Sequence, residues 1–453
     1  MTFSIIGIVF LALGILGWIF SERLFIVILA ASAAFTTSAA VTVGGYSVSP
    51  FHVVGVLAVI SAIVSRFRGV GPGHTAATLL MCALGWSALV TAIGPSLFRG
   101  MPILEPKGGI DRQVFDPTPL AYTPSMAAQL AYLTIGVGVA VYLAQRQELR
   151  PSLATIPIAL GTFLSALALL PGGGETIGAL FRNSASAWYN AYEARLSGIF
   201  AEPSFLGVFS VMALAFALFR VAPAKGFEKL VLIGVILIAP ITLLASGSAV
   251  GAVALVILVA TAIVYYGARF IFARMKLHPA WLLVPFTLVF ALATPNTLTG
   301  TLTSVITGKT DTESFRNRFA SDFFSIDLTA QTYGFGVGLG ASRPSSFATL
   351  VISNVGVVGF ALLASAIVLA LVRARRSPQW VAVPVALFAL VLAKVIAEPA
   401  LSTPMMWLLL GMCMYAGRTV PGSPAVIGVD RAESVARPPK NTARRNEAVG
   451  RVT

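Results

Sequence analysis

The sequence predicts an all-α integral membrane protein, a polytopic bundle of about 12–13 transmembrane helices joined in part by long loops. Of its 453 residues, 57% are hydrophobic and only 11% are charged, and the mean hydropathy is +0.88. Soluble globular proteins carry roughly 25% charged residues. The chain has too little polar surface to cover a water-facing fold, so the composition excludes a cytosolic enzyme, a secreted domain and a disordered protein.

Thirteen apolar stretches approach the length of about 20 residues that crosses a bilayer. In lipid each stretch must satisfy its own backbone hydrogen bonds, which favours helices. The first two stretches could be shorter than drawn and the last is marginal, so twelve spans are also consistent with the sequence. The stretches are Phe3–Phe20, Leu24–Ala40, Phe51–Ser65, Thr75–Ile93, Ser125–Ala144, Ser152–Leu170, Ser204–Phe219, Leu230–Ala245, Ala249–Tyr266, Ala280–Thr294, Phe347–Val372, Gln379–Ala397 and Pro404–Ala416.

The net charge of +14 follows the membrane topology. When the connections are assigned alternately to two sides, one side holds 21 basic and six acidic residues, and the other holds nine basic and eleven acidic residues. The basic side is therefore expected in the cytoplasm, together with a disordered basic tail over residues 418–453. The N-terminus then faces outward. The charge needs no nucleic-acid partner to explain it.

Three long outward loops, near residues 94–124, 171–203 and 295–346, carry most of the remaining charged residues. Long loops of this kind are usually functional or disordered. The two cysteines, Cys82 and Cys413, lie in apolar runs, and the three histidines are far apart in the sequence. We therefore expect no metal site and no cofactor.

The second outward loop ends with Arg195, Glu202, Pro203 and Ser204, directly before a span. A helix that begins at Pro203 would present an N-terminus that favours anions, and an arginine beside it would suit a phosphate. Glu202 could then act as a general base or orient a sugar hydroxyl. The alternative is a capped helix with an ion pair at the membrane surface.

The third outward loop holds Arg316 and Arg318, two residues apart, which diverge on a helix but share a side in an extended stretch. A glycine-rich run that includes Gly336 and Gly338 follows, and then Arg343. Its backbone N–H groups are candidates to cradle a pyrophosphate. The alternative is a tightly packed loop at the entry of a helix.

Two further features lie at span ends. Ser246 and Ser248 form a small-residue turn that could bind a substrate or only pack helices together. Lys394 and Glu398 form an i,i+4 pair near the outward end of a span. Ionisable residues in spans are functional candidates by default. The alternative is that Glu398-Pro399 ends the helix at the surface.

Taken together, these segments resemble the superfamily of Wzy-type polysaccharide polymerases and O-antigen ligases. The stretch Arg195-Leu-Ser-Gly-Ile-Phe-Ala-Glu-Pro-Ser-Phe-Leu-Gly207 is similar to a motif of its exopolysaccharide polymerases. The turn Ser246–Gly251 matches the superfamily loosely. The run Gly336-Val-Gly-Leu-Gly-Ala-Ser-Arg-Pro-Ser-Ser346, with the following Leu350–Gly359, is similar to its later motif. The resemblance covers residues 50 to 416.

The resemblance implies an inverting, metal-independent glycosyltransferase of the bacterial inner membrane with periplasmic loops and a cytoplasmic C-terminus. Its substrate would be an undecaprenyl-diphosphate-linked oligosaccharide, drawn from the membrane lipid, and its protein partners a chain-length regulator and a flippase. The resemblance assigns catalytic roles to Arg195 and Arg318, with Arg343 as a third candidate. It leaves the catalytic base open, and the residues offer Glu202 as the first candidate and His52 as the second. The residues and the resemblance together predict a substrate-binding set of Arg316, Arg343, Ser204, Ser246, Ser248, Gly336, Gly338 and Ser345.

Two departures from the ligase pattern favour a polymerase. Ligases usually have a histidine after the glycine-rich motif, where this chain has Ser345-Ser346, and an arginine where this chain has Gly247. The chain departs slightly from the polymerase pattern too, because the spacing of Arg195 and Gly207 is one residue longer than in that pattern. A ligase remains the second hypothesis. A flippase or other transporter, which would place its polar sites at the bilayer midplane, is the third.

Overall fold

The computed structural model describes residues 2–44, 46–67, 75–104, 117–184, 195–273 and 313–418. All of them belong to one compact unit, Met1–Val420. The expected span Ala280–Thr294, most of the tail and parts of all three outward loops lie outside the described residues.

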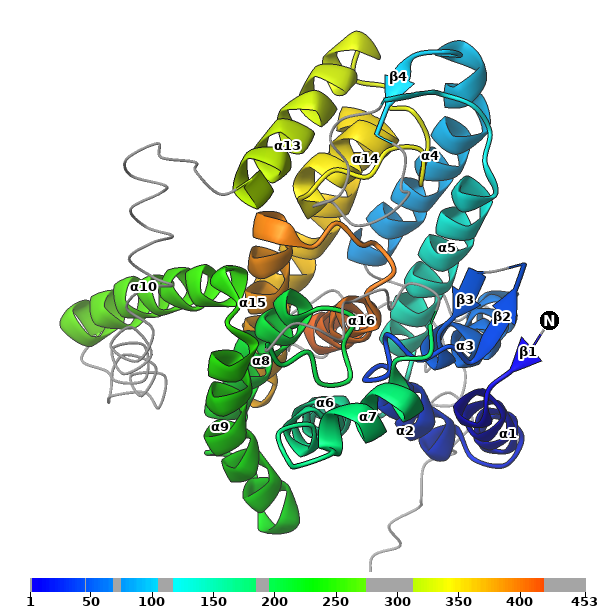
Figure 1. Cartoon of the computed structure of the whole chain (residues 1–453). Coiled ribbons are helices and arrows are strands. Elements are labelled where there is room, and N and C mark those ends of the chain that lie inside the picture. Colours follow the sequence, from blue (N-terminus) through cyan, green and yellow to red (C-terminus); the bar gives the residue numbers. More distant parts are fainter. Residues whose placement is uncertain are drawn as a thin grey trace, which may run out of the picture. The chain divides into compact units, whose positions relative to one another are not determined.

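The helices, labelled in Figure 1, are α1 (Ile5–Phe20), α2 (Glu22–Ser32), α3 (Pro50–Phe67), α4 (Thr75–Leu97), α5 (Pro124–Ala144), α6 (Thr155–Leu167), α7 (Gly173–Phe181), α8 (Pro203–Arg220), α9 (Gly226–Ser246), α10 (Ala249–Ala273), α13 (Glu313–Gln331), α14 (Phe347–Ala374), α15 (Ala382–Ala397) and α16 (Pro404–Arg418).

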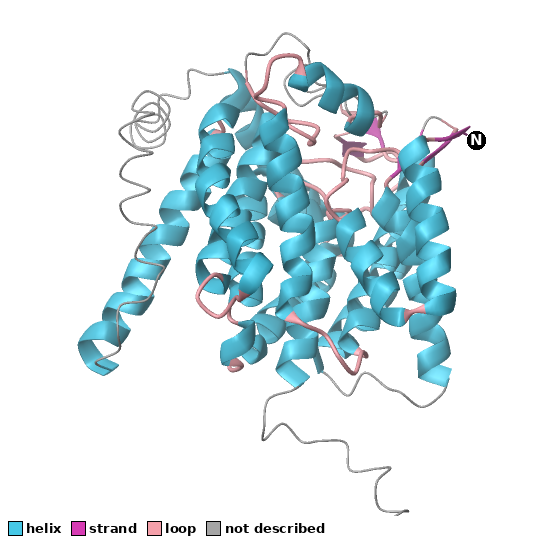
Figure 2. Cartoon of the chain, turned by 90° about the horizontal axis from the view of Figure 1, so that it is seen from below, coloured by secondary structure: helices cyan, strands magenta, loops and turns pink. Residues whose placement is uncertain are grey.

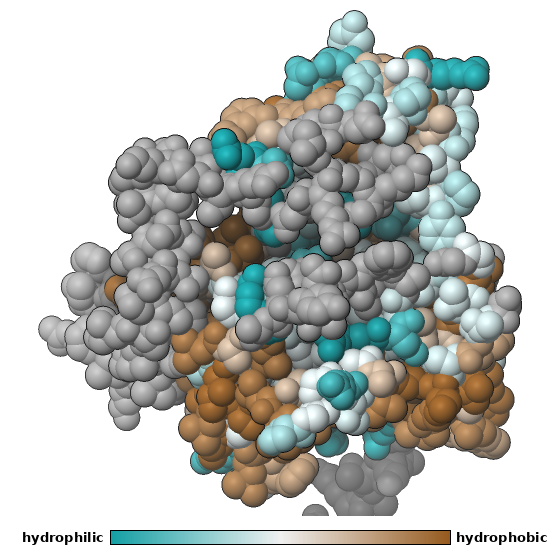
Figure 3. Space-filling view, viewed as in Figure 1, coloured by the Kyte–Doolittle hydropathy of each residue, from teal (hydrophilic) through white to brown (hydrophobic). Residues whose placement is uncertain are grey.

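The helical character expected from the sequence is confirmed within the described residues. Five helices there are long and apolar enough to cross a membrane: α4, α5, α8, α9 and α14. Each expected span that lies within the described residues coincides at least in part with a helix. Short 3-10 turns, η2 (Pro151–Ala154) and η4 (Pro378–Trp380), precede α6 and α15. Exposed hydrophobic side chains gather over α9 and α1 (Figure 3), as expected of helices that face lipid.

The second expected span, Leu24–Ala40, is wrong in its length. The helix there, α2, has 11 residues and ends at Ser32, and 11 residues rise only about 16 Å, far less than the hydrocarbon core. The residues that follow α2 bond to the last residue of α7 and to the segment after it instead of continuing the helix. Ser38 Oγ donates to the Phe181 carbonyl at 2.9 Å, and the Ala39 N–H donates to Asn183 Oδ1 at 2.7 Å.

Side-chain contacts join connections that the charge pattern places on one side, here termed the basic end. Three of the four link segments that are distant in the sequence, so those connections lie at the same end of the bundle; the Arg220–Glu228 pair lies within one connection. The contacts are Arg23–Glu148 at 2.8 Å, Arg220–Glu228 at 2.8 Å, Arg373 to Thr75 Oγ1 at 3.3 Å and Arg418 to the Ala144 carbonyl at 3.2 Å.

Two helices supply the centre of the bundle. In α16 every residue from Pro404 to Gly417 is buried, and in α8 every residue from Leu206 to Phe219 is buried. Helices that are apolar on all sides are typical of positions enclosed by other helices. α16 packs against α5, α14 and α15, and Figure 1 shows it in the middle of the bundle. The contact with α5 is close, because a Cβ on Gly136 would lie 2.5 Å from the Trp407 indole.

Short strands interrupt the expected all-helical fold at the end opposite to the basic end, here termed the loop end. The strands β1 (Thr2–Phe3), β2 (Val41–Val43) and β3 (Tyr46–Val48) form an antiparallel sheet, and β4 (Pro102–Ile103) pairs with β5 (Thr118–Pro119). Figure 2 shows these strands and many of the loops at one end of helices that run side by side. The candidate site residues lie at this end.

Candidate functional site

Arg195 anchors the second outward loop onto the end of α9. Its Nε donates to the Ser246 carbonyl at 3.0 Å and its Nη2 donates to the Gly247 carbonyl at 3.2 Å. Gly247 ends α9 in the left-handed region, with φ of +52°. The neighbouring Leu196 N–H donates to the Ala245 carbonyl at 3.0 Å. The arginine therefore binds the last carbonyls of a helix, an arrangement that cations favour.

Glu202 and Ser204 stand at the start of α8, which begins at Pro203 as expected. Glu202 is the extended residue before the helix, and its carbonyl accepts from the Phe205 N–H at 3.1 Å. Ser204 Oγ donates to Glu202 Oε2 at 3.0 Å. Both residues are half-buried. The geometry leaves Glu202 as a carboxylate at a helix N-terminus, where negative charge is stabilised.

The turn that contains Ser246 and Ser248 packs helices together. The two residues are 0% and 1% exposed. Ser246 Oγ donates to the Leu243 carbonyl at 2.7 Å, and Ser248 Oγ accepts from the Gly251 N–H at 3.0 Å. A Cβ on Gly207 of α8 would lie 2.5 Å from the Ser248 Cβ. The expectation that these hydroxyls face a substrate does not match this structure, because both are enclosed and bonded within the turn.

The glycine-rich run also has a packing role. Gly336 and Gly338 are buried, with φ of +92° and +105°. The Gly336 N–H donates to Thr332 Oγ1 at 3.2 Å, and the Gly338 N–H donates to the Asn354 carbonyl at 2.8 Å. The expected pyrophosphate cradle is therefore not formed here: these N–H groups are used within the protein. The alternative of a tightly packed loop at the entry of a helix describes the structure better.

The run packs against a break in α14. Gly356 has φ of +71° and ψ of +179°, which only glycine adopts readily. A Cβ on Gly356 would lie 2.3 Å from the backbone oxygens of both Gly334 and Phe335. The carbonyl of Val355, on the N-terminal side of the break, accepts from Trp86 Nε1 at 2.8 Å. The break thus lets a loop backbone approach the helix backbone directly.

Replacing Gly356 with alanine is expected to destabilise the protein by about 3 kcal/mol or more, because backbone strain adds to a clash with backbone atoms that have no rotamer to adopt. The measurement is thermal unfolding of the purified protein in detergent. Gly85→Ala is the control, since nothing lies within 4 Å of a Cβ at Gly85. Its stability should stay the same or rise by up to about 1 kcal/mol. Equal stability of the two variants would contradict this account of the break.

The two arginines of the third loop lie on a helix, α13, and therefore diverge. Arg316 is exposed, whereas Arg318 is half-buried. Arg318 precedes Ser321 by three residues and Ser325 by seven, so it lies on the face of α13 that is buried in its later turns. Neither arginine side chain forms a hydrogen bond or ion pair with the side chains or backbone that the structure describes. Arg318 is thus a half-buried residue whose guanidinium donors have no partner within that part of the chain.

Asp322, one turn after Arg318, fastens α13 to the start of α14. Its Oδ1 accepts from the N–H groups of Ser345 and Ser346, each at 3.0 Å, and from Thr349 Oγ1 at 2.7 Å. A carboxylate at a helix N-terminus satisfies N–H groups that have no partner within the helix. Sequence reasoning did not single out Asp322. The sequence feature that could have identified it is its position four residues after Arg318, on the same face of the helix.

Replacing Asp322 with alanine is expected to lower stability by about 2 kcal/mol, because a charged acceptor shared by three donors is lost. Asp322→Asn should lose less, since an amide oxygen still accepts. Thermal unfolding in detergent measures both. An alanine variant as stable as the parent protein would mean that α13 is held by other contacts.

Arg343 and Ser345 occupy the segment between the glycine-rich run and α14. Arg343 is exposed, its N–H donates to the Leu104 carbonyl at 3.0 Å, and its side chain has no partner among the described residues. Ser345 is 2% exposed, and its Oγ forms no hydrogen bond. Arg343 is therefore accessible to a ligand, whereas Ser345 is closed off in this structure.

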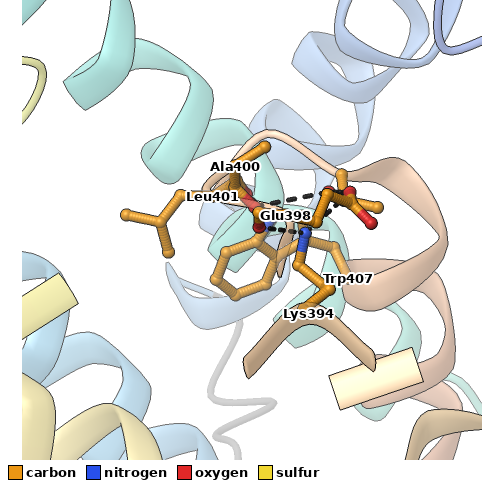
Figure 4. A network of polar contacts seen from close by, with 6 residues as sticks. Lys394, Glu398, Ala400, Leu401 and Trp407 are labelled. Atoms are coloured by element: carbon orange, nitrogen blue, oxygen red, sulfur yellow. Dashed lines mark hydrogen bonds and ion pairs between the residues drawn. The ribbon is translucent and has the colours of Figure 1, made fainter. Parts of the chain in front are cut away.

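Lys394 and Glu398 form a buried ion pair at the end of α15 (Figure 4). Lys394 is 0% exposed and Glu398 is 6% exposed. Lys394 Nζ donates to Glu398 Oε1 at 2.8 Å and to Thr403 Oγ1 at 2.7 Å. The nearby Trp407 Nε1 donates to the Leu401 carbonyl at 2.7 Å. The pair was visible in the sequence, but its burial was not: Glu398 does not simply end a helix at the surface.

Arg182, which sequence reasoning also passed over, lies after α7 and beside the second loop. Its Nη1 donates to Ser197 Oγ at 2.6 Å and its Nη2 donates to the Gly174 carbonyl at 3.2 Å, while the buried Nε has no partner. Burial lowers the pKa of Arg182 from its ordinary value, yet arginine stays charged at physiological pH. It positions the segment between Arg195 and Glu202.

The histidine and the possible metal ligands are the remaining candidates in the described ranges. His52, the second candidate base, is 4% exposed, and its Nδ1 lies 2.8 Å from Ser49 Oγ. No group of three or more His, Cys, Asp or Glu residues there could hold a metal ion. Comparison with models of known protein families and with curated proteins gives no match for this chain. Any function must therefore be argued from the geometry of the loop end.

Proposed function

We propose that this chain is a bacterial inner-membrane polysaccharide polymerase of the Wzy-type superfamily. In this proposal about 12–13 helices span the membrane, the basic end and the C-terminus face the cytoplasm, and the loop end faces the periplasm. The enzyme transfers glycan from undecaprenyl diphosphate onto another lipid-linked repeat unit. The apolar helices, the basic end and the cationic groups at the loop end support this proposal.

The observation that carries the proposal is the state of Arg318. Arg318 is half-buried, and its guanidinium has no partner among the described residues, so its donors are available to a ligand. A diphosphate matches its planar fork of donors. When the glycosidic bond breaks, the leaving diphosphate gains charge, and a fixed cation stabilises that charge in the transition state.

The other expected site residues have different roles in the proposed transfer reaction. Arg343 is exposed and unpaired within the described residues, so it can bind the same diphosphate. Arg316 points to another side of α13 and is placed at the edge of the site. Arg195 is used at the end of α9, and we assign it to holding the loop that carries Glu202 and Ser204. Gly336, Gly338, Ser246, Ser248 and Ser345 shape the protein around the site.

The position of Lys394 argues against the transporter hypothesis. A transporter is expected to gather polar groups at the bilayer midplane. Lys394 lies instead in the last turn of α15, beside Glu398 and Thr403 at the loop end. A ligase that attaches the finished glycan to another acceptor uses the same diphosphate chemistry and remains the second candidate.

The experiment is a deletion strain complemented with the parent gene, with surface polysaccharide separated on a gel and lipid-linked glycan extracted from each face of the membrane. A polymerase predicts single repeat units in the deletion strain and a restored ladder on complementation. Full-length polymer retained on its lipid carrier would replace the polymerase with a ligase. Accumulation of lipid-linked units only on the cytoplasmic face would indicate a transporter.

A further inference from the structure

Burying the Lys394–Glu398 pair at the end of α15 costs free energy, and the task of ending that helix does not explain why a charged pair is kept there. Taking two ions out of water costs several kcal/mol per ion, and their attraction often only offsets that cost. Both ions lie almost fully buried in a helix that is otherwise apolar. Ionisable residues retained in such surroundings are functional candidates. Closing a helix end needs no buried lysine, since a backbone or hydroxyl group suffices.

The two oxygens of Glu398 differ. Oε1 is fixed by Lys394 Nζ and by Thr403 Oγ1, each at 2.8 Å. Oε2 forms no hydrogen bond, and Figure 4 shows it without a dashed line. The Glu398 side chain keeps a small exposed part, 8%. The carboxylate is thus held by one oxygen, and the other oxygen has no hydrogen-bond partner among the described residues.

Contacts connect Glu398 to the arginine that carries the proposed function. Lys394 Nζ lies 5.3 Å from the centre of the Phe347 ring, at the first residue of α14. The preceding Ser346 N–H donates to Asp322 Oδ1 on α13. Asp322 is one helical turn from Arg318. A carboxylate and a guanidinium are therefore placed at the same end of the bundle, at the end of α15 and on α13, each of which packs against α14.

We propose that Glu398 is the general base of the transfer and that Lys394 is the residue that positions it. This inference rests on the proposed polymerase function. Glu398 Oε2 takes the proton of the acceptor hydroxyl while the oxygen of that hydroxyl attacks the anomeric carbon of the donor. The new C–O bond forms as the bond to the diphosphate breaks, and the bonding electron pair leaves with the lipid diphosphate. The proton then passes from Glu398 to water.

This assignment differs from the one expected from the sequence, Glu202. The carboxylate of Glu202 has a sufficient structural explanation, because it lies at the start of α8 and binds Ser204. Its loop is tied to α9 through Arg195. Glu398 is instead connected, through Lys394 and the start of α14, to the part of α13 that carries Asp322 and Arg318.

The test is a double variant, Glu398→Gln with Lys394→Met. It removes the base but leaves no unpaired buried charge, so the protein is expected in the membrane at the parent level. Its rate of polymerisation, measured with lipid-linked glycan extracted from the deletion strain, should fall at least about 100-fold. Binding of that glycan should persist. Added formate should restore part of the rate of Glu398→Ala with Lys394→Met, by entering the vacated space as a base.

The matched control is Arg220→Gln with Glu228→Gln, which removes an ion pair at the basic end and should keep the parent rate. A double variant of Glu398 and Lys394 that polymerises at the parent rate would overturn the assignment while leaving the polymerase proposal intact. Loss of activity in Glu202→Gln alone, with that double variant active, would move the role to Glu202. A deletion strain with normal polymer would overturn both proposals together.

Discussion

Replacing Arg318 with alanine is expected to lower polymer formation about 100- to 1,000-fold, the loss found when one fixed donor to a developing negative charge is removed. The reason is that Arg318 is half-buried and unpaired among the described residues, so its donors are available to a diphosphate. Arg318→Lys should recover only part of the activity, because an ammonium group cannot form the bidentate contact. The measurement is the polysaccharide ladder of the complemented deletion strain, supported by the rate with extracted lipid-linked glycan.

Two further arginine variants make this result specific. Arg316→Ala should lose less than about 10-fold, since Arg316 is exposed and points to another side of α13. Arg376→Ala, at the basic end, should keep the parent ladder. All variants must be present in the membrane at similar levels. A normal ladder with Arg318→Ala would remove the observation on which the proposed function depends.

The second large effect is on stability. Lys394→Met alone is expected to cost about 3–5 kcal/mol, because it leaves the Glu398 carboxylate buried without its cation. Adding Glu398→Gln to the same chain should recover most of that loss. Thermal unfolding in detergent and the steady-state level in the membrane both measure the stability of the single and the double variant.

The comparison for Lys394 is Arg220→Met, whose partner Glu228 has a side chain 21% exposed and can be hydrated. That single change should cost clearly less. If Lys394→Met unfolds at the parent temperature, the pair is hydrated in the protein, and the account of its burial is wrong.

The helices were the most predictable feature, because lipid imposes their length and their apolar surface. The exception, α2, shows the limit. Its apolar run continues to Ala40, but Ser38 and its neighbours bond to the chain near residues 181–184, more than 140 positions away. A local pattern does not contain such a partner.

The candidate site was predictable in its residue types and less so in their roles. The spacing of Arg316 and Arg318 left a helix or an extended stretch open, and only the fold decides between them. Alternate glycines correctly indicated a close approach of backbone. They did not indicate which segment the glycine-rich run would pack against. In the structure that segment is the backbone of α14 where the helix is broken at Gly356. The burial of Lys394 likewise depends on α14 and α16, which a helix considered alone does not show.

The central place of α16 bears on how the protein is made. This helix follows in the sequence all the helices that it packs against, including α5, where Gly136 leaves room for Trp407. Chains are synthesised from the N-terminus, so the earlier helices are inserted before the one that fills their common interior exists. Until then the surfaces of α5, α14 and α15 that α16 covers lack their partner. Assembly of this bundle is thus a late event, completed after the ribosome has passed residue 418.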